Sequence, residues 1–188
     1  MPGDLRPWEL LGSELAFDHR WDRVRRDTVR LPSGDVVDDY LVSVRPDVAL
    51  VCAVTSDAKL VVVHQWKQGV RSFMLELPGG ICDENEDPVV TAGRELTEET
   101  GYVCPNLTRL GSFEVDPSKN SNLMHIYLGI GAELTGETSL DSNEQIDVQL
   151  LPLAEARDAM ADGRLTSLGT VAGIELALVA LASEPTVA

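Results

Sequence analysis

Residues 80–102 read GICDENEDPVVTAGRELTEETGY, a stretch that combines a glycine-rich turn with clear signals for a helix. Asp87 is a favourable N-cap residue, Pro88 suits the first helical position, and Gly101 suits a C-terminal stop. These three signals predict a helix over residues 88–100, entered from a glycine-rich turn.

Three carboxylates share one face of this predicted helix. At about 100° per residue, Glu95 and Glu99 lie about 40° apart, and Glu98 lies about 60° to the other side of Glu95. Like charges in this arrangement destabilise a helix by about 0.2–0.5 kcal/mol per pair. One interpretation is a solvated face on which Arg94 pairs with Glu98. The other is a cation site, because carboxylates beside a glycine-rich turn supply the hard oxygen ligands that Mg²⁺ or Mn²⁺ prefers.

The composition places limits on the class of protein. The chain has 188 residues, a length typical of one domain with an extension, and 44% of them are hydrophobic. The formal net charge of −16 disfavours binding to nucleic acid or to an anionic membrane surface. The three cysteines lack CxxC spacing, and no leader or membrane-spanning run is recognised, so we expect reduced thiols and a cytoplasmic protein.

Hydrophobic patterning predicts an α+β protein. Turn residues at 31–35 separate two strands of an N-terminal β-hairpin, and β-branched runs follow that suit the interior of a sheet. The expected strands cover residues 23–31, 36–44, 48–55, 60–66, 73–77, 107–115, 123–130 and 146–151. The expected helices, besides residues 88–100, cover 153–162 and 167–182.

The quoted stretch resembles the signature of the Nudix hydrolases. The pattern Gly-x5-Glu-x7-Arg-Glu-(apolar)-x-Glu-Glu-x-Gly-(apolar) is matched, with Tyr102 as a mild departure at its last position; the matching residues are Gly80, Glu86, Arg94, Glu95, Leu96, Glu98, Glu99 and Gly101. The resemblance implies an α/β/α sandwich with a mixed sheet.

The same resemblance implies roles for the box residues. Glu95, Glu99 and the Gly79 carbonyl would be the principal metal ligands, and Glu98 would hold a second ion. Glu86 would pair with Arg94, either in an orienting role or as a plain surface ion pair. Mg²⁺, or alternatively Mn²⁺, would neutralise a substrate diphosphate, stabilise charge on the phosphoryl oxygens and lower the pKa of an attacking water.

Features outside the box resemble the ADP-ribose pyrophosphatase branch of that family. They are the run Gln65-Trp66-Lys67, the run Leu75-Glu76-Leu77-Pro78-Gly79-Gly80, and Pro117, 15 residues after the box. This implies substrate-binding positions at Trp66, Lys67, Glu76 and Pro117, although Lys67 replaces the usual Arg and Gly79 the usual Ala. It further implies a homodimer built through an N-terminal arm, residues 1–46, joined to a catalytic domain, residues 47–188.

Other polar and aromatic residues keep two interpretations. In the same branch the general base comes from an acidic loop before the last strand, where Glu144 is the first choice and Glu137 the second, unless both are solvated loop acids. Trp66 either stacks on a nucleobase or packs at the end of a strand. His19, His64 and His125 lack ligand spacing, so we expect structural or surface roles.

The leading hypothesis is therefore hydrolysis of a nucleoside diphosphate linked to a second moiety, with ADP-ribose yielding AMP and ribose 5-phosphate. The first alternative is another nucleotide sugar, such as a GDP-sugar, or a dinucleotide. The second is a Nudix-fold sensor that binds a nucleotide sugar without cleaving it. The third, isoprenoid isomerisation, needs a catalytic cysteine that Cys52, Cys82 and Cys104 do not obviously supply.

Overall fold

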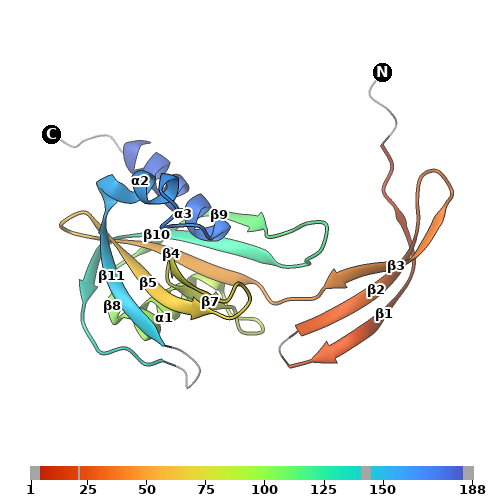
Figure 1. The fold of residues 1–188 in the computed structure, drawn as a ribbon, viewed down its shortest axis with the longest axis horizontal. Helices are drawn as coiled ribbons and strands as arrows, with labels where there is room; N and C mark the ends of the chain where they lie inside the picture. The colour runs from red at the N-terminus through yellow and green to blue at the C-terminus, as the bar shows by residue number, and fades with distance from the viewer. Residues whose placement is uncertain (1–4, 21, 141–144, 184–188) are drawn as a thin grey trace. The chain divides into compact units, whose positions relative to one another are not determined.

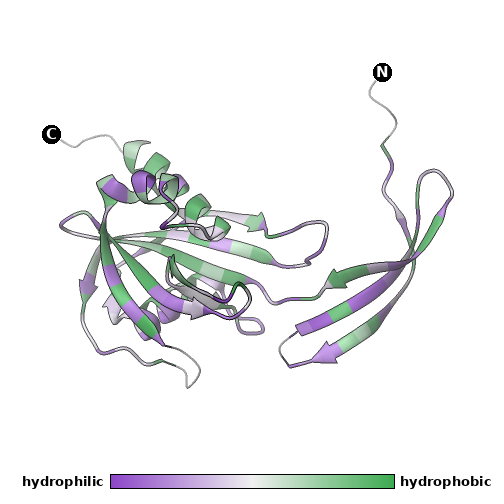
Figure 2. Ribbon diagram, in the orientation of Figure 1, coloured by the Kyte–Doolittle hydropathy of each residue, from purple (hydrophilic) through white to green (hydrophobic). Residues whose placement is uncertain are grey.

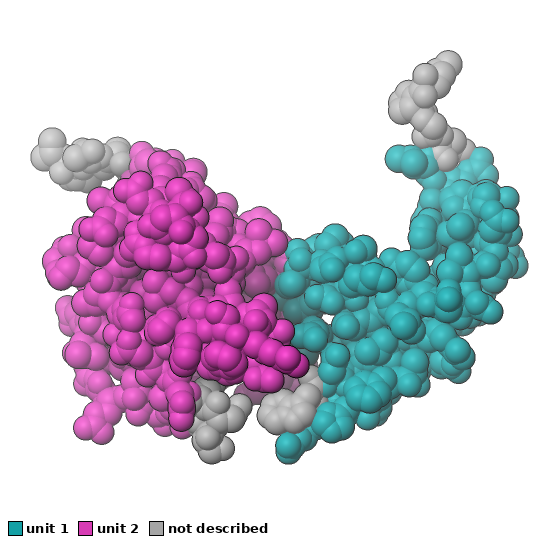
Figure 3. Space-filling model, in the orientation of Figure 1, with its two compact units in different colours: residues 1–46, 114–123 teal, residues 47–113, 124–188 magenta. Residues whose placement is uncertain are grey.

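The computed structural model describes residues 5–20, 22–140 and 145–183. The chain divides into two compact units, shown in different colours in Figure 3. Unit 1 comprises residues 1–46 and 114–123, and unit 2 comprises residues 47–113 and 124–188.

Unit 1 is a three-stranded antiparallel sheet in the order β1-β2-β3. Its strands are β1 (Glu9–His19), β2 (Asp22–Arg30) and β3 (Val36–Ser43). β2 and β3 form the expected hairpin, whereas β1 is an additional strand that the sequence analysis did not predict. Residues 114–123 join this unit because the Tyr40 hydroxyl donates to the Ser118 carbonyl at 2.8 Å and the Ser43 amide donates to the Lys119 carbonyl at 2.7 Å.

Unit 2 contains a mixed eight-stranded sheet. Its main path runs β11-β5-β4-β10-β8, and β6, β7 and β9 pair with β5, β4 and β10, respectively. β4 and β10 are parallel, whereas β5 is antiparallel to β4, β6 and β11, β7 is antiparallel to β4, and β8 is antiparallel to β10. The strands are β4 (Val48–Thr55), β5 (Lys59–Lys67), β6 (Ser72–Glu76), β7 (Gly79–Ile81), β8 (Tyr102–Val103), β9 (Leu107–Glu114), β10 (Leu123–Leu134) and β11 (Ile146–Pro152).

Helices cover both faces of this sheet (Figure 1). They are α1 (Pro88–Thr100) on one face, and α2 (Ala156–Ala161) and α3 (Leu168–Ser183) on the other, with a 3₁₀ turn, η1 (Leu153–Glu155), before α2. Alternate residues of β4 point to opposite faces: Val51 packs in the core under α1, and Cys52 packs in the core with Ile174 of α3. The expected α/β/α sandwich is therefore confirmed.

Most expected elements are found within a residue or two of their predicted ends, and α1 has the predicted bounds. β7 and β8 were not predicted, and the expected helix over residues 153–162 begins with the 3₁₀ turn. Among the described residues, no helix is long and apolar enough to cross a membrane.

Candidate active site

Helix α1 is fixed at both ends by the residues that predicted it. The Asp87 carboxylate accepts a hydrogen bond from the Val89 amide at 3.2 Å, and Pro88 takes the first helical position. Gly101 ends the helix with φ of 72°, and its amide donates to the Thr97 carbonyl at 2.8 Å. These caps hold the acidic face of α1 in a defined position beside β7.

Glu99 joins α1 to the glycine-rich turn. The residue is only 4% exposed, and its carboxylate accepts a hydrogen bond from the Gly79 amide at 2.8 Å. Gly79 has φ of +156°, and a Cβ there would lie 2.2 Å from the Ala49 carbonyl oxygen, so the position requires glycine. A Cβ on Gly80 would lie 2.4 Å from the Glu95 carboxyl group. The two glycines therefore make room for the close approach of β7 to β4 and to α1.

Arg94 is the cation at the centre of the acidic face. Its Nη1 donates to Glu95 at 2.8 Å and to Glu98 at 2.9 Å, and its Nη2 lies 3.3 Å from Glu86. Burial alone would lower the pKa of Arg94, but the hydrogen bonds to the three carboxylates outweigh it, so the pKa lies above its usual value. The expected pairs of Arg94 with Glu86 and with Glu98 both form, within one network of four charged groups.

Thr91 is a member of this network that sequence reasoning missed. It is fully buried, and its hydroxyl donates to Glu86 Oε2 at 2.6 Å. This hydrogen bond, followed by that from Arg94, lowers the pKa of Glu86 below its usual value. A sequence signal was available, because a threonine on the inner face of a helix needs a polar partner.

Two of the residues expected to contact substrate lie together on neighbouring strands. Lys67 on β5 and Glu76 on β6 form an ion pair at 3.2 Å. Trp66 is 46% exposed, its ring meets Phe73 edge to face with centroids 5.3 Å apart, and its Nε1 donates to Gln68 at 3.0 Å. Trp66 thus combines a packing contact with a large exposed surface.

The remaining predicted residues belong to the other unit, to a separate loop of unit 2, or to the part of the chain outside the described residues. Pro117 belongs to unit 1, whereas the box belongs to unit 2. Glu144 falls among residues 141–144, outside the described part of the chain. The loop that carries the exposed Glu137 is bonded to the end of α1, because the Ser139 amide donates to the Glu98 carbonyl at 2.8 Å and the Gly136 amide donates to the Gly101 carbonyl at 3.3 Å.

Comparison with known families identifies this arrangement. The model of the NUDIX domain matches residues 44–168, which include the whole acidic network. The chain belongs to the Nudix family. A second model, the nucleoside diphosphate sugar hydrolase N-terminal domain, matches residues 8–43. The chain is thus a Nudix hydrolase, and the family resemblance of its sequence is confirmed.

Relatives of this Nudix hydrolase are named for different substrates and roles. It is 32% identical to the methanol dehydrogenase activator of Bacillus methanolicus, over 92% of this chain and 94% of the relative. It is 32% identical to a CMP-5'-(N-acetyl-N-hydroxy-3-aminopropyl)phosphonate hydrolase of Streptomyces rubellomurinus, over 89% of this chain and 80% of the relative. It is 31% identical to an ADP-ribose pyrophosphatase of Bacillus subtilis, over 79% of this chain and 80% of the relative.

A solved structure shares the fold. The crystal structure of an ADP compounds hydrolase superposes with a TM-score of 0.84 at 23% sequence identity, covering 95% of this chain and 96% of that one.

The donor set of the Nudix box fits a hard divalent cation. The carboxylates of Glu95, Glu98 and Glu99 are all oxygen donors, and Gly80 leaves space against the Glu95 carboxyl group that a Cβ would fill. In the described part of the chain these side chains are not gathered as three or more metal ligands, and Arg94 bridges two of them. A bound cation would therefore take over the charge compensation that Arg94 provides to Glu95 and Glu98.

All three histidines have partners in the described structure, and the ring of His19 stacks on that of Phe17 with centroids 6.1 Å apart. His125 is 7% exposed, with Nδ1 at 2.6 Å from Ser112 Oγ and Nε2 at 3.2 Å from Asp47 Oδ2. His64 packs against Phe73, with ring centroids 5.3 Å apart.

Proposed function

We propose that this Nudix hydrolase cleaves the diphosphate of a nucleoside diphosphate-linked moiety in a reaction that depends on a divalent cation. The preferred substrate is ADP-ribose, which yields AMP and ribose 5-phosphate. The observation that carries the proposal is the acidic network of α1, held against the glycine-rich turn by the bond between Glu99 and Gly79. Mg²⁺ is the proposed cation, with Mn²⁺ as the alternative, because both prefer oxygen donors.

The box residues supply the ligands and their orientation. Glu95, Glu99 and the Gly79 carbonyl hold the principal ion, and Glu98 holds a second ion. When bound, the metal neutralises the diphosphate and lowers the pKa of the attacking water. Arg94 and Glu86 orient the glutamates through the network described above.

A carboxylate must accept the proton of that water as its oxygen bonds to phosphorus and the bridging P–O bond breaks. We assign this role to Glu144, with Glu137 as the second choice. The attachment of the Glu137 loop to the end of α1 at Glu98 and Gly101 supports an acidic loop close to the box.

The substrate's nucleoside and sugar are assigned to residues outside the box. Trp66 offers an exposed aromatic face for a nucleobase, and the Lys67–Glu76 pair offers a cation and a carboxylate to the sugar and the phosphates. Pro117 is likewise proposed as a substrate-binding residue.

We further propose that the enzyme is a homodimer that assembles through residues 1–46. All 11 residues of β1 are exposed, and they include the large apolar side chains of Leu10, Leu11, Leu15 and Phe17. A second copy of the sheet would cover them. The three free thiols support a cytoplasmic location.

The decisive experiment replaces two box glutamates. The double variant Glu98→Gln, Glu99→Gln is expected to lose at least about 10³-fold in kcat with Mg²⁺ and ADP-ribose, since both proposed ion sites are weakened. The matched control is Glu133→Gln, Glu155→Gln, which removes the same charge at two exposed positions of unit 2. Undiminished hydrolysis by the box variant would overturn the proposal.

A substrate panel separates the alternatives. Faster turnover of a GDP-sugar or of a dinucleotide than of ADP-ribose would move the assignment to that substrate. Tight binding of ADP-ribose without turnover in the presence of Mg²⁺ would indicate a sensor. Isomerase chemistry is disfavoured because burial raises the pKa of Cys52 to about 12 and that of Cys104 to about 11, which keeps both thiols protonated.

A further inference from the structure

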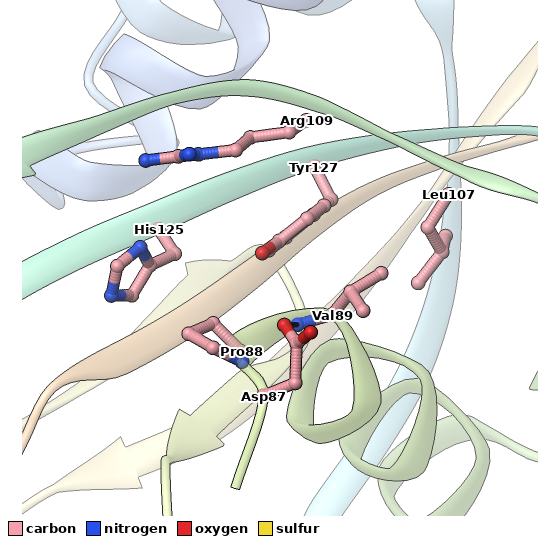
Figure 4. Close-up of a pocket in the computed structure, with 7 residues that line it drawn as sticks. All are labelled: Asp87, Pro88, Val89, Leu107, Arg109, His125 and Tyr127. Atoms are coloured by element: carbon pink, nitrogen blue, oxygen red, sulfur yellow. Dashed lines mark hydrogen bonds between the residues drawn. The ribbon is translucent and has the colours of Figure 1, made fainter. Parts of the chain in front are cut away.

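A pocket of about 380 Å³ lies in unit 2 beside the N-terminal end of α1 (Figure 4). Asp87, Pro88 and Val89 line one side of it, and side chains from β9 and β10 line the other. None of the seven residues that line it is a glutamate of the Nudix box. The pocket is therefore separate from the acidic network, although both border the same helix.

Tyr127 points a polar atom into this pocket. The residue is 4% exposed, and its hydroxyl has no hydrogen-bond partner in the described part of the chain. Figure 4 shows the phenol oxygen directed toward the space between Pro88, Asp87 and His125. Burial, and then the charge of Asp87, raise the pKa of Tyr127, so the phenol stays neutral and keeps its proton. The hydroxyl therefore keeps its donor and acceptor capacity for a ligand that enters the pocket.

The neighbours of Tyr127 are already held in place. Both ring nitrogens of His125 are occupied, by Ser112 and by Asp47. Arg109 donates from Nη2 to Ser112 Oγ at 2.5 Å, which leaves its other N–H groups for a ligand. The site is thus ordered before any ligand enters, which lowers the entropy cost of binding.

The charges around the pocket limit the ligand. Arg109 and the Asp87 carboxylate both line the pocket, and a second carboxylate, that of Asp47, lies 3.2 Å from the Nε2 atom of His125. Two carboxylates against one guanidinium disfavour a phosphate group. A neutral molecule that carries both donors and acceptors suits the mixture of Arg109, Tyr127 and Asp87.

The walls between these polar groups are apolar. Pro88, Val89 and Leu107 provide them, and the ring of Tyr127 adds a flat surface. Small-molecule sites are generally apolar pockets of about 300–1,000 Å³ with a few polar groups that fix orientation. A flat heterocycle with a polar edge matches this combination of walls and hydrogen-bonding groups.

We propose that this pocket binds an uncharged nucleobase or nucleoside, at a site distinct from the Nudix box. The heterocycle lies against Pro88, Val89 and Leu107, and its polar edge bonds to the Tyr127 hydroxyl and to Asp87. The ribose of a nucleoside extends toward the open side of the pocket.

The test is a titration followed by backbone amide NMR on the full-length chain without divalent cation. Adenosine and guanosine are the probes. At least one should bind with a dissociation constant below about 1 mM and shift the amides of Val89, Leu107 and Tyr127. Tyr127→Phe should weaken that binding about 3- to 10-fold because it loses one hydrogen bond. The matched control, Tyr102→Phe, removes a phenol hydroxyl from another part of unit 2 and should leave the affinity unchanged.

A second variant tests the polar edge without removing the helix cap. Asp87→Ser keeps a side-chain acceptor for the Val89 amide and removes the carboxylate, so it should weaken nucleoside binding while the thermal midpoint stays close to that of the wild type. Shifts confined to Gly80 and Glu95 would overturn the proposal, as would tighter binding of AMP than of adenosine. The proposal would also be overturned if a zwitterionic amino acid such as leucine bound and the nucleosides did not. It would be overturned as well if neither nucleoside bound at about 5 mM, far above the expected dissociation constant of below about 1 mM.

Discussion

The two sheets of this Nudix hydrolase differ in what covers them. In unit 2, β4 and β5 lie between helices, and the central residues of both strands are fully buried. In unit 1, β1 is exposed at every residue, and ion pairs such as Arg30–Glu9 and Arg23–Asp18 tie it to β2. Figure 2 shows the same contrast, with apolar β4 and β5 and a polar β2. Unit 2 is therefore stabilised mainly by burial within the chain, whereas unit 1 buries few apolar side chains, among them Val29 and Val42, and has many of its interactions at the surface.

The largest expected effect tests that contrast directly. Leu60→Ala, in the core of unit 2, should lower the free energy of unfolding by about 2–5 kcal/mol, because the leucine is fully buried on β5. Leu41→Ala on β3, where the leucine is 47% exposed, should lower it by less than about 1 kcal/mol. Urea unfolding followed by circular dichroism measures both. Equal losses would show that unit 1 has as much buried core as unit 2.

The second prediction concerns the exposed apolar side chains of β1. Leu15→Ser, Phe17→Ser should raise the dissociation constant of the proposed homodimer about 10-fold or more, since interface side chains of this size commonly contribute over 1 kcal/mol. Sedimentation equilibrium measures the constant. The matched control is Leu134→Ser, Val179→Ser, which removes two apolar side chains from unit 2 that are at least as exposed as Leu15 and Phe17. If the two double variants had the same dimer dissociation constant, β1 would not be part of the dimer interface.

The same contrast decides which elements the sequence predicted. β4 and β5 were predicted because burial on both faces gives them continuous apolar runs. β1 was missed because Gly12 and Ser13 interrupt its apolar residues, and two register shifts break the alternation of period two. β7 and β8, with three and two residues, are too short for any periodicity.

The residues of the candidate site also differ in how well the sequence predicted them. The acidic face of α1 follows from spacing along one helix, so its glutamates were found from the sequence. Thr91 and the pocket at Tyr127 depend on contacts between separate elements, which spacing does not reveal. A partial signal existed, because His125 and Tyr127 are alternate residues of one predicted strand and therefore share a face.

The third prediction asks whether the two units unfold separately. Asp87→Ala removes the side-chain acceptor at the start of α1 and should destabilise the helix by about 1 kcal/mol. Hydrogen exchange should accelerate for amides of α1 and of the strands beneath it, while amides of β2 keep their rates. Asp87→Ser serves as the control, because it retains an acceptor. Equal acceleration in β2 would show that the two units unfold as one.

The smallest expected effect is a pH dependence within unit 1. Asp27 on β2 is 6% exposed and accepts hydrogen bonds from Ser13 Oγ at 2.6 Å and from Arg25 Nε at 3.0 Å. Burial favours the protonated carboxyl, but these two partners prevail and lower its pKa below the ordinary value of 3.8. A carboxyl whose pKa is lowered by folding stabilises the folded state above its unfolded pKa, and this contribution is lost as the pH falls through the folded pKa.

Protection of the β2 amides should therefore decrease as the pH falls below 3.8 in the wild type, and less steeply in Asp27→Asn. The variant lacks the ionisable group, so it should be the less stable form at neutral pH and approach the wild type in acid. Asp38→Asn, at an exposed position of β3, is the matched control and should follow the wild type. If the β2 amides of Asp27→Asn lose protection as steeply as those of the wild type when the pH falls, the buried Asp27 carboxylate does not cause the acid sensitivity of unit 1. The exposed ion pairs would then account for it.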